Sequence, residues 1–326
     1  MALALTRAQI LAFRRRVGAL DKRLPQGERS LRQAAWAGLQ DSMPRAALLS
    51  IHARVEGAHS MIWDDPSLVQ VWGPRYSVFV VPKRDYALFT LGRYPDDERG
   101  RRVAEEMAVS LHKILAGRRM PDRELGLTNR VRYATTTGTV QIRWEGARAP
   151  LVWNVPRPKI DPAVARDELA RRYLHVYGPT TAVAFAKWAG ISAPMARAAF
   201  DALDLTSVRT PIGDAWILSS DEPEFGAESE PAAARLLPSG DSFFLLQGVD
   251  RELLVPDAKR RDLLWTPRVW PGAVLVAGEI VGTWRRADAN LAVDPWRKLS
   301  RAEWAAVEAE AASLPLPGGG ASAILN

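Results

Sequence analysis

The sequence predicts an α+β fold, because runs of apolar residues at helical spacing alternate with short β-type runs three times along the chain. In each of these three segments, helices separated by a turn are followed by a strand or a hairpin. That order is typical of a winged helix-turn-helix unit. After residue 220 the chain changes character, and an acidic stretch leads into short β-type runs broken by Gly and Pro. We therefore expect three winged helix-turn-helix units followed by a small C-terminal β-barrel-like domain.

The expected boundaries follow from the linkers between these segments, and a chain of 326 residues is long enough for several units. Winged-helix unit 1 covers residues 1–95, unit 2 covers 96–158 and unit 3 covers 159–220. The β-barrel-like domain covers 221–326 and includes a terminal helix over 300–315 and a loose tail over 318–326. The three units differ too much in sequence to be a tandem repeat.

In the first unit, the run from Thr6 to Gln9 has the pattern of a capping box and predicts the start of a helix that Gly18 ends. Two further helices are expected at about residues 30–38 and 44–55, before a strand over 76–81. In the second unit, Asp96 is the expected cap of a helix over 97–115. The remaining predicted elements of units 2 and 3 are helical runs at 121–126, 127–136, 161–177, 180–190 and 192–203, and hairpins at 139–155 and 206–220.

The composition excludes several kinds of site. The chain has no cysteine, which excludes disulfides, thiolate nucleophiles and iron–sulfur clusters, and its four histidines lack the spacing of metal ligands. We expect no metal and no cofactor. No apolar run reaches the ~18 residues of a membrane span, so we expect a cytoplasmic protein with no membrane contact.

The charge distribution suggests a polyanionic partner. The net charge is +7, with about +9 in residues 1–132, about +3 in 133–220 and about −5 in the remainder. A basic region of this size favours binding to nucleic acid, although an arginine-rich composition has the same effect on the pI. The predicted partner is double-stranded DNA, bound by a monomer in the nucleoid.

Three stretches of the sequence suggest a family. "ARDELARRYLHVYGPTTAVAFAKWAG", "RLLPSGDSFFLLQGVDRELLVP" and "WPGAVLVAGEIVGTWRR" resemble landmarks of the AlkZ-like and YcaQ-like winged-helix DNA-binding proteins, which include bacterial DNA glycosylases. The resemblance runs in order from about residue 6 to residue 316. It implies a body of winged-helix units that holds duplex DNA and hydrolyses the N-glycosidic bond of alkylated bases, including bulky adducts and crosslinks, in DNA repair or self-resistance.

The resemblance also implies a position for the active site. In the glycosylases, a motif of Gln, an apolar residue and then Gln or Asp lies near the end of the second helix of the first unit. The matching residues here are Gln40, Asp41 and Ser42. Gln40 keeps the first position, whereas Ser42 has a shorter side chain than the residue it replaces. On a helix, a one-residue offset turns a side chain by ~100°, so Asp41 is expected to face away from Gln40 unless the backbone breaks there.

The same residues also have a purely structural interpretation. Asp41 or Ser42 can cap the helix that follows, by accepting hydrogen bonds from its first free amides. Trp36 precedes Gln40 by one helical turn and is a possible neighbour of the site, although core packing is the favoured explanation for it. His52 on the next helix is a second possible neighbour.

Four arginines are the expected DNA contacts. Arg143 and Arg148 lie in or beside the tip of the 139–155 hairpin, and Arg118 and Arg119 follow the long helix of unit 2. The function we predict is that of a monofunctional DNA glycosylase. The alternative is a non-catalytic winged-helix DNA-binding protein, a regulator or damage binder, that has lost the motif.

Overall fold

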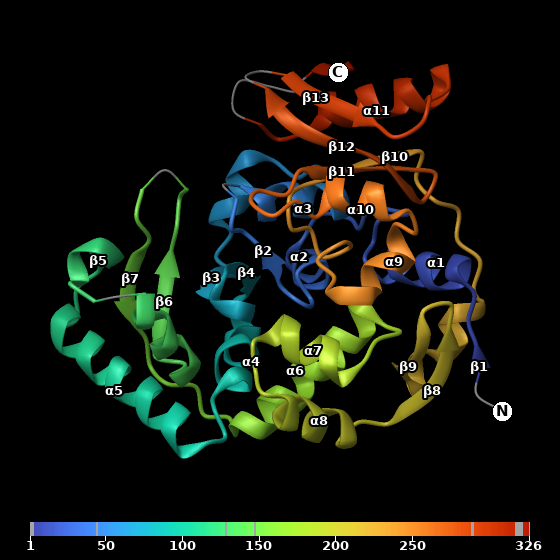
Figure 1. The fold of residues 1–326 in the computed structure, drawn as a ribbon. Coiled ribbons are helices and arrows are strands. Elements are labelled where there is room, and N and C mark those ends of the chain that lie inside the picture. Colours follow the sequence, from blue (N-terminus) through green and yellow to red (C-terminus); the bar gives the residue numbers. More distant parts are fainter. Residues whose placement is uncertain are drawn as a thin grey trace.

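The computed structural model describes residues 3–43, 45–127, 129–146, 148–287, 290–316 and 322–325. These residues form helices and three separate sheets, so the predicted α+β class is confirmed. Figure 1 shows the C-terminal sheet lying across one end of the molecule and the helix and hairpin of residues 98–154 projecting to one side. None of the helices within the described ranges is both long and apolar enough to cross a membrane.

The first segment contains the elements that carry the candidate motif. They are β1 (Leu3–Ala4), α1 (Arg7–Val17), α2 (Glu28–Ala34), β2 (Leu39–Gln40), α3 (Ala46–Arg54), β3 (Leu68–Trp72), β4 (Val78–Pro82) and α4 (Tyr86–Thr90). The predicted capping box is present, because the Thr6 hydroxyl accepts from the Gln9 amide and the Gln9 side chain accepts from the Thr6 amide.

The second predicted helix is shorter than expected. Helix α2 ends at Ala34, and residues 39–40 form a strand that pairs antiparallel with β4. Gly38 adopts a φ of +75°, and a Cβ atom there would lie 2.9 Å from the Phe89 ring. This position therefore requires glycine and breaks the helix before the motif. The expectation that Gln40 ends a helix is wrong.

The second segment contains the predicted long α-helix, whereas its two shorter helical runs are 3₁₀ helices. Helix α5 (Glu98–Leu115) is capped by Asp97, whose carboxylate accepts from the Gly100 amide. The predicted cap, Asp96, instead forms an ion pair with Arg166. Two 3₁₀ helices, Asp122–Leu125 and Asn129–Thr137, stand where α-helices were expected.

A hairpin follows, as predicted, and completes a shared sheet. Strand β6 (Val140–Arg143) pairs antiparallel with β7 (Leu151–Asn154), which also pairs with β5 (Met120–Pro121). Apart from β1, the strands of the first two segments form one six-stranded sheet in the order β2-β4-β3-β6-β7-β5. The two halves of this sheet meet where Gln70 of β3 pairs with Ile142 of β6.

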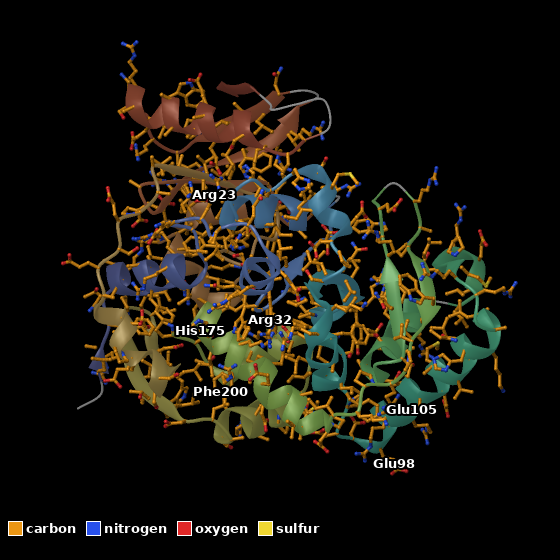
Figure 2. All side chains as sticks on the ribbon, turned by 180° about the vertical axis from the view of Figure 1, so that it is seen from behind. Arg23, Arg32, Glu98, Glu105, His175 and Phe200 are labelled. Carbon is orange, nitrogen blue, oxygen red and sulfur yellow. The ribbon has the colours of Figure 1, made fainter. Side chains whose placement is uncertain are left out.

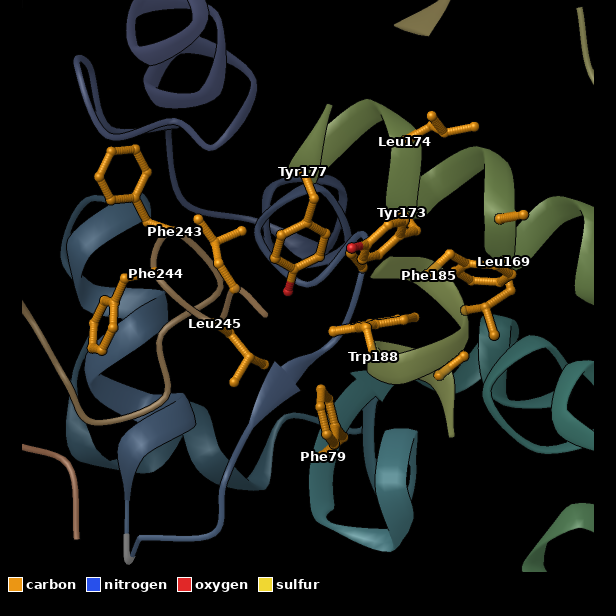
Figure 3. Close-up of a cluster of buried hydrophobic side chains, with 14 of the residues drawn as sticks. Phe79, Leu169, Tyr173, Leu174, Tyr177, Phe185, Trp188, Phe243, Phe244 and Leu245 are labelled. Atoms are coloured by element: carbon orange, nitrogen blue, oxygen red, sulfur yellow. The ribbon is translucent and has the colours of Figure 1, made fainter. Parts of the chain in front are cut away.

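The third segment follows the prediction closely. It contains α6 (Pro162–Tyr177), α7 (Ala182–Ala189), α8 (Ala193–Asp201) and the hairpin of β8 (Leu205–Thr210) and β9 (Gly213–Leu218), with β1 added parallel to β8. Figure 3 shows Tyr173, Tyr177, Phe185 and Trp188 packed together in the core. Trp188 meets Phe79 of β4 edge to face, with ring centroids 6.4 Å apart, so this core supports the strand that pairs with Gln40.

The C-terminal segment contains an open sheet. The elements of this segment are β10 (Ala234–Leu237), α9 (Arg251–Leu254), α10 (Ala258–Leu264), β11 (Gly272–Val276), β12 (Glu279–Ala287), β13 (Asn290–Pro295), α11 (Arg301–Ser313) and β14 (Ser322–Leu325). Within the described residues β10 and β14 are the two edges and do not pair, so no closed barrel forms. Helix α11 packs on the apolar face of the sheet, through Val307 and Ala311, and covers what barrel closure would otherwise bury.

The expected loose tail is partly ordered. Residues 322–325 pair parallel with β13 as strand β14. The remaining residues of the expected tail lie outside the described ranges.

Candidate functional site

The motif segment is extended, and this decides which side chains share a face. Gln40 of β2 pairs with Phe79 of β4. The Asp41 amide continues this pairing by donating to the Val78 carbonyl at 2.7 Å. Successive side chains alternate across an extended segment. Gln40 and Ser42 accordingly line one cavity, while Asp41 points to the other side.

Asp41 is a structural carboxylate in this conformation. Its side chain is only 1% exposed and accepts hydrogen bonds from the Ala47 amide at 3.0 Å and from Gln70 Nε2 at 2.8 Å. The capping interpretation therefore holds for Asp41, which satisfies a first-turn amide of α3, although Arg45 occupies the N-cap position. Burial raises the pKa of the Asp41 carboxyl to about 7, against the two hydrogen bonds, which lower it.

The Gln40 amide is fixed from two sides. Its Oε1 accepts a hydrogen bond from the Arg75 guanidinium at 3.1 Å. On the other side lies Gly240, with a φ of +74°, where a Cβ atom would come within 3.3 Å of Gln40 Cδ and Nε2. The backbone of the 238–246 loop therefore approaches the Gln40 side chain as closely as glycine allows.

A buried ion pair holds that loop against α3. The guanidinium of Arg54 donates to both carboxylate oxygens of Asp241 at 2.7 Å, and Ser50 Oγ donates to Asp241 Oδ2 at 2.6 Å. Arg54 also donates to Ser242 Oγ at 3.0 Å. Arg54 and Asp241 are each 1% exposed. Their satisfied network fixes the position of the loop relative to the motif segment.

The cavity beside Gln40 has a volume of about 340 Å³. It is lined by residues that are far apart in sequence: Gln40, Ser42, Met43, Arg75, Ser239, Gln247, Arg251, Arg268, Val269 and Trp270. Among the described residues that line it there are three arginines and no carboxylate. The cavity is therefore polar and carries a positive potential.

A larger apolar cavity adjoins the first. It has a volume of about 480 Å³ and lies between α3 and the C-terminal sheet, where Leu48, Leu49 and Trp284 line it. The two cavities share the residues Met43, Ser239, Val269 and Trp270. A ligand can therefore extend from the polar space beside Gln40 into the apolar one.

Several residues of the cavity were missed by sequence reasoning. Ser239, Gln247 and Arg251 lie within the stretch "RLLPSGDSFFLLQGVDRELLVP", so the family landmark contained them without indicating their role. Arg75 had no signal in the sequence. It occupies a left-handed conformation with a φ of +53°, and its backbone packs against Gly190.

The two predicted neighbours of the site lie elsewhere. Trp36 follows the end of α2 and stacks under the Arg172 guanidinium, 3.9 Å from the ring centroid, rather than lining the cavity. Its relation to Gln40 was inferred from a helix that does not continue that far.

His52 faces the C-terminal helix. Its Nε2 lies 3.2 Å from Ser313 Oγ of α11, and the Arg23 guanidinium donates to its carbonyl and to Glu310. Figure 2 shows Arg23 where the N-terminal helices meet the C-terminal sheet. Burial, and next the Arg23 charge, lower the pKa of His52 to about 4, so the ring is neutral at pH 7. His52 therefore helps to join α3 to α11.

The four arginines expected to contact DNA lie on or near α5 and the β6–β7 hairpin, and none of them lines the Gln40 cavity. Arg143 forms ion pairs with Asp64, at 2.5 Å, and with Glu145, at 3.8 Å. Arg118 donates to the carbonyls that end α5, and the Arg119 guanidinium stacks on Trp153 at 4.5 Å. Arg148 is exposed and lines a second surface cavity with Arg143. DNA contact by these four residues stays a prediction.

The residues present suggest no metal centre. In the described part of the chain, no three of the His, Asp and Glu side chains gather closely enough to hold an ion. The chemistry available at the cavity is that of amides, hydroxyls and guanidinium groups.

Comparison with known proteins places this geometry in a family. The family model "DNA glycosylase AlkZ-like" matches residues 123–315. The interstrand DNA cross-link repair glycosylase of Streptomyces sahachiroi is 31% identical over 159 residues, which are 47% of this chain and 42% of that relative. The alignment therefore spans less than half the length of either protein.

The fold is shared over the whole chain. The solved structure of the Streptomyces sahachiroi DNA glycosylase AlkZ superimposes with a TM-score of 0.80 at 19% identity, covering 99% of this chain and 100% of that one. The match of the family model to more than half of the residues, together with this fold, shows that the chain belongs to the AlkZ-like DNA glycosylase family.

Proposed function

We propose that this protein is a monofunctional DNA glycosylase that hydrolyses the N-glycosidic bond of alkylated bases in duplex DNA. The observation that carries the proposal is that Gln40 and Ser42 lie on one face of an extended segment and line one cavity. This is the segment where the family resemblance implies the catalytic motif. The relative that acts in interstrand cross-link repair supports the same class of reaction.

Gln40 and Ser42 carry the groups that hydrolysis of the glycosidic bond of an alkylated purine requires. A cationic base departs as a neutral molecule, so little activation of the leaving group is required, and the site has to position water against an oxocarbenium-like sugar. Gln40 Oε1 accepts one hydrogen bond from Arg75, and its second lone pair is available to a water. The Ser42 hydroxyl on the same face is a second acceptor for that water. We assign the catalytic role to Gln40 with help from Ser42, and the role of Asp41 to holding the segment in place.

The apolar cavity supports activity on bulky lesions. Met43 and Trp270 line both cavities, so a base beside Gln40 would place its alkyl substituent next to Leu48 and Leu49. Burying an apolar substituent there is favourable by about 25 cal/mol per Å² of removed surface. Binding of the duplex itself is assigned to the basic side chains of the hairpin, Arg143 and Arg148, and to Arg118 and Arg119.

The test is base release from alkylated duplex DNA. The wild-type protein is incubated with duplexes carrying 7-methylguanine, 3-methyladenine or a bulkier purine adduct, and free base is quantified by mass spectrometry. Gln40→Ala is the site variant, and Arg209→Ala, an exposed position on β8, is the control. We expect release by the wild type and the control and loss of release with Gln40→Ala. Absence of release from every duplex by the wild-type protein would leave the non-catalytic DNA-binding alternative.

A further inference from the structure

We infer that Arg75, Arg251 and Arg268 form a phosphate-binding site beside Gln40, and that its ligand is a phosphodiester of the DNA backbone. All three side chains line the 340 Å³ cavity that Gln40 and Ser42 also line. The inference rests on the proposed function, because it takes DNA as the substrate. It adds the part of the substrate that the cavity holds and the residues that hold it.

The first argument is that the positive charges in this cavity are not neutralised. Among the described residues, no carboxylate forms an ion pair with any of the three arginines. Two fully buried arginines of the chain do have such partners, since Arg54 has Asp241 at 2.7 Å and Arg172 has Asp85 at 2.9 Å. Like charges gathered without counter-charges destabilise the free protein, and a bound anion removes that cost.

The second argument is that these arginines border open space. Arg14 and Arg93 also lack ion pairs within the described chain, but they donate to backbone carbonyls inside the packed core. Among the described residues, the only side-chain hydrogen bond of Arg75 goes to Gln40 Oε1. Burial lowers the pKa of both Arg75 and Arg251, and the charge of Arg75 contributes to lowering the pKa of Arg251. The two guanidinium groups therefore repel one another across the cavity.

The third argument is that Arg251 is already held in place. Its Nε donates to the Leu246 carbonyl at 3.0 Å, and the guanidinium lies over the rings of Trp265 and Trp270, at 5.1 Å and 5.3 Å from their centroids. A guanidinium fixed by stacking loses little conformational entropy on binding, and its planar donors match phosphate oxygens. The site is therefore prepared for an anion with several acceptor oxygens.

The position next to Gln40 explains why the anion would be a backbone phosphate. Because Arg75 contacts Gln40 directly, a phosphate on Arg75 places the adjoining deoxyribose near Gln40 and Ser42. The negative charge of that phosphate would then lie between the arginines and the developing sugar cation. A bound phosphate thus removes the repulsion that an arginine-lined cavity would exert on an oxocarbenium-like transition state.

The experiment measures binding to a duplex that cannot release a base. A fluorescent duplex carries one central tetrahydrofuran nucleotide, and two matched duplexes replace the phosphodiester on its 5′ or 3′ side by an uncharged methylphosphonate. The variants are Arg75→Gln, Arg251→Gln and Arg268→Gln, with Arg209→Gln as a control that removes the same charge from β8. Arg268 is exposed, so Arg268→Gln tests the site even where a buried substitution fails to fold.

We expect each cavity variant to bind the unmodified duplex about tenfold more weakly and to lower the salt slope of binding by about one unit, whereas Arg209→Gln binds as the wild type does. The wild type should bind one of the two methylphosphonate duplexes about tenfold more weakly than it binds the unmodified duplex. The cavity variants should bind that methylphosphonate duplex as well as they bind the unmodified one. Equal weakening of the variants on all three duplexes, or no weakening at all, would overturn the inference.

A free phosphate is the other source of the same chemistry. Thermal denaturation with inorganic phosphate distinguishes the two. Stabilisation that depends on Arg268, together with duplex binding that does not, would overturn the assignment to DNA. Because the tetrahydrofuran duplex has no base to lose, these results stand whether or not the protein releases alkylated bases.

Discussion

The buried carboxyl of Asp41 makes folding stability depend on pH in a direction that can be measured. Its pKa is raised from 3.8 to about 7, chiefly by burial. The folded protein therefore holds the proton of Asp41 more tightly than the unfolded chain does. The stabilisation by this proton is complete below pH ~4 and is lost as the pH rises through about 7. We predict that Asp41→Asn removes this pH dependence.

The size of the effect follows from the shift. Between pH 5 and pH 6 the folded state carries about one more proton than the unfolded state, so the free energy of unfolding falls there by about 1.4 kcal/mol per pH unit, and by progressively less towards pH 8. From pH 5 to pH 8 the loss is about 2.5 kcal/mol in the wild type. In Asp41→Asn, Oδ1 still accepts from Ala47, but the new amide opposes the Gln70 amide, at a pH-independent cost of about 1 kcal/mol.

The assay is urea unfolding of both proteins at pH 5, 6, 7 and 8, with the difference in the free energy of unfolding taken at each pH. The difference should move by about 2.5 kcal/mol in favour of Asp41→Asn from pH 5 to pH 8. His52, with its lowered pKa, gives the opposite trend in acid, but it is present in both proteins and cancels. A difference that stays constant to within ~0.5 kcal/mol would refute the assignment of a raised pKa to Asp41.

Three further predictions concern the surroundings of the site. Asp241→Ala leaves the buried Arg54 charge without its partner, so the free energy of unfolding should fall by about 3–5 kcal/mol in urea titrations; no change would contradict the network. Gly240→Ala adds a Cβ atom 3.3 Å from the Gln40 amide at a φ of +74°, so base release should fall more than the ~1–2 kcal/mol loss of stability explains. His52→Gln removes a ring that is neutral when folded, so the protein should resist acid unfolding between pH 6.5 and about 4 better than the wild type.

Several local signals in the sequence were confirmed by the structure. The capping box at Thr6, the α6 helix ending at Gly178 and the 139–155 hairpin depend on residues close together in the chain, and the structure contains all three. The conformation of Gln40 was not predictable in this way. Strand β2 has only two residues and exists because it pairs with β4, some forty positions later. Its helical appearance came from the apolar spacing before it.

The candidate site required tertiary structure for the same reason. Gln40 was identified from the family motif, but Gln247 and Arg251 follow a loop that the buried Arg54–Asp241 pair holds against α3. Arg75 comes from a different turn, whose backbone packs against Gly190. The expected barrel is an open sheet because α11 covers its apolar face. Periodicity predicts that strands exist, whereas the element that covers a sheet is decided by long-range packing.

The most direct measurement of the central claim is the single-turnover rate of base release with duplex saturated by protein. Under these conditions weaker binding does not lower the rate, so the rate reports the chemical step alone. Gln40→Ala should be slower than the wild type by about a hundredfold or more, and Ser42→Ala by less, because loss of an orienting group raises the barrier by several kcal/mol. Release by Gln40→Ala at the wild-type rate would show that Gln40 does not position the attacking water.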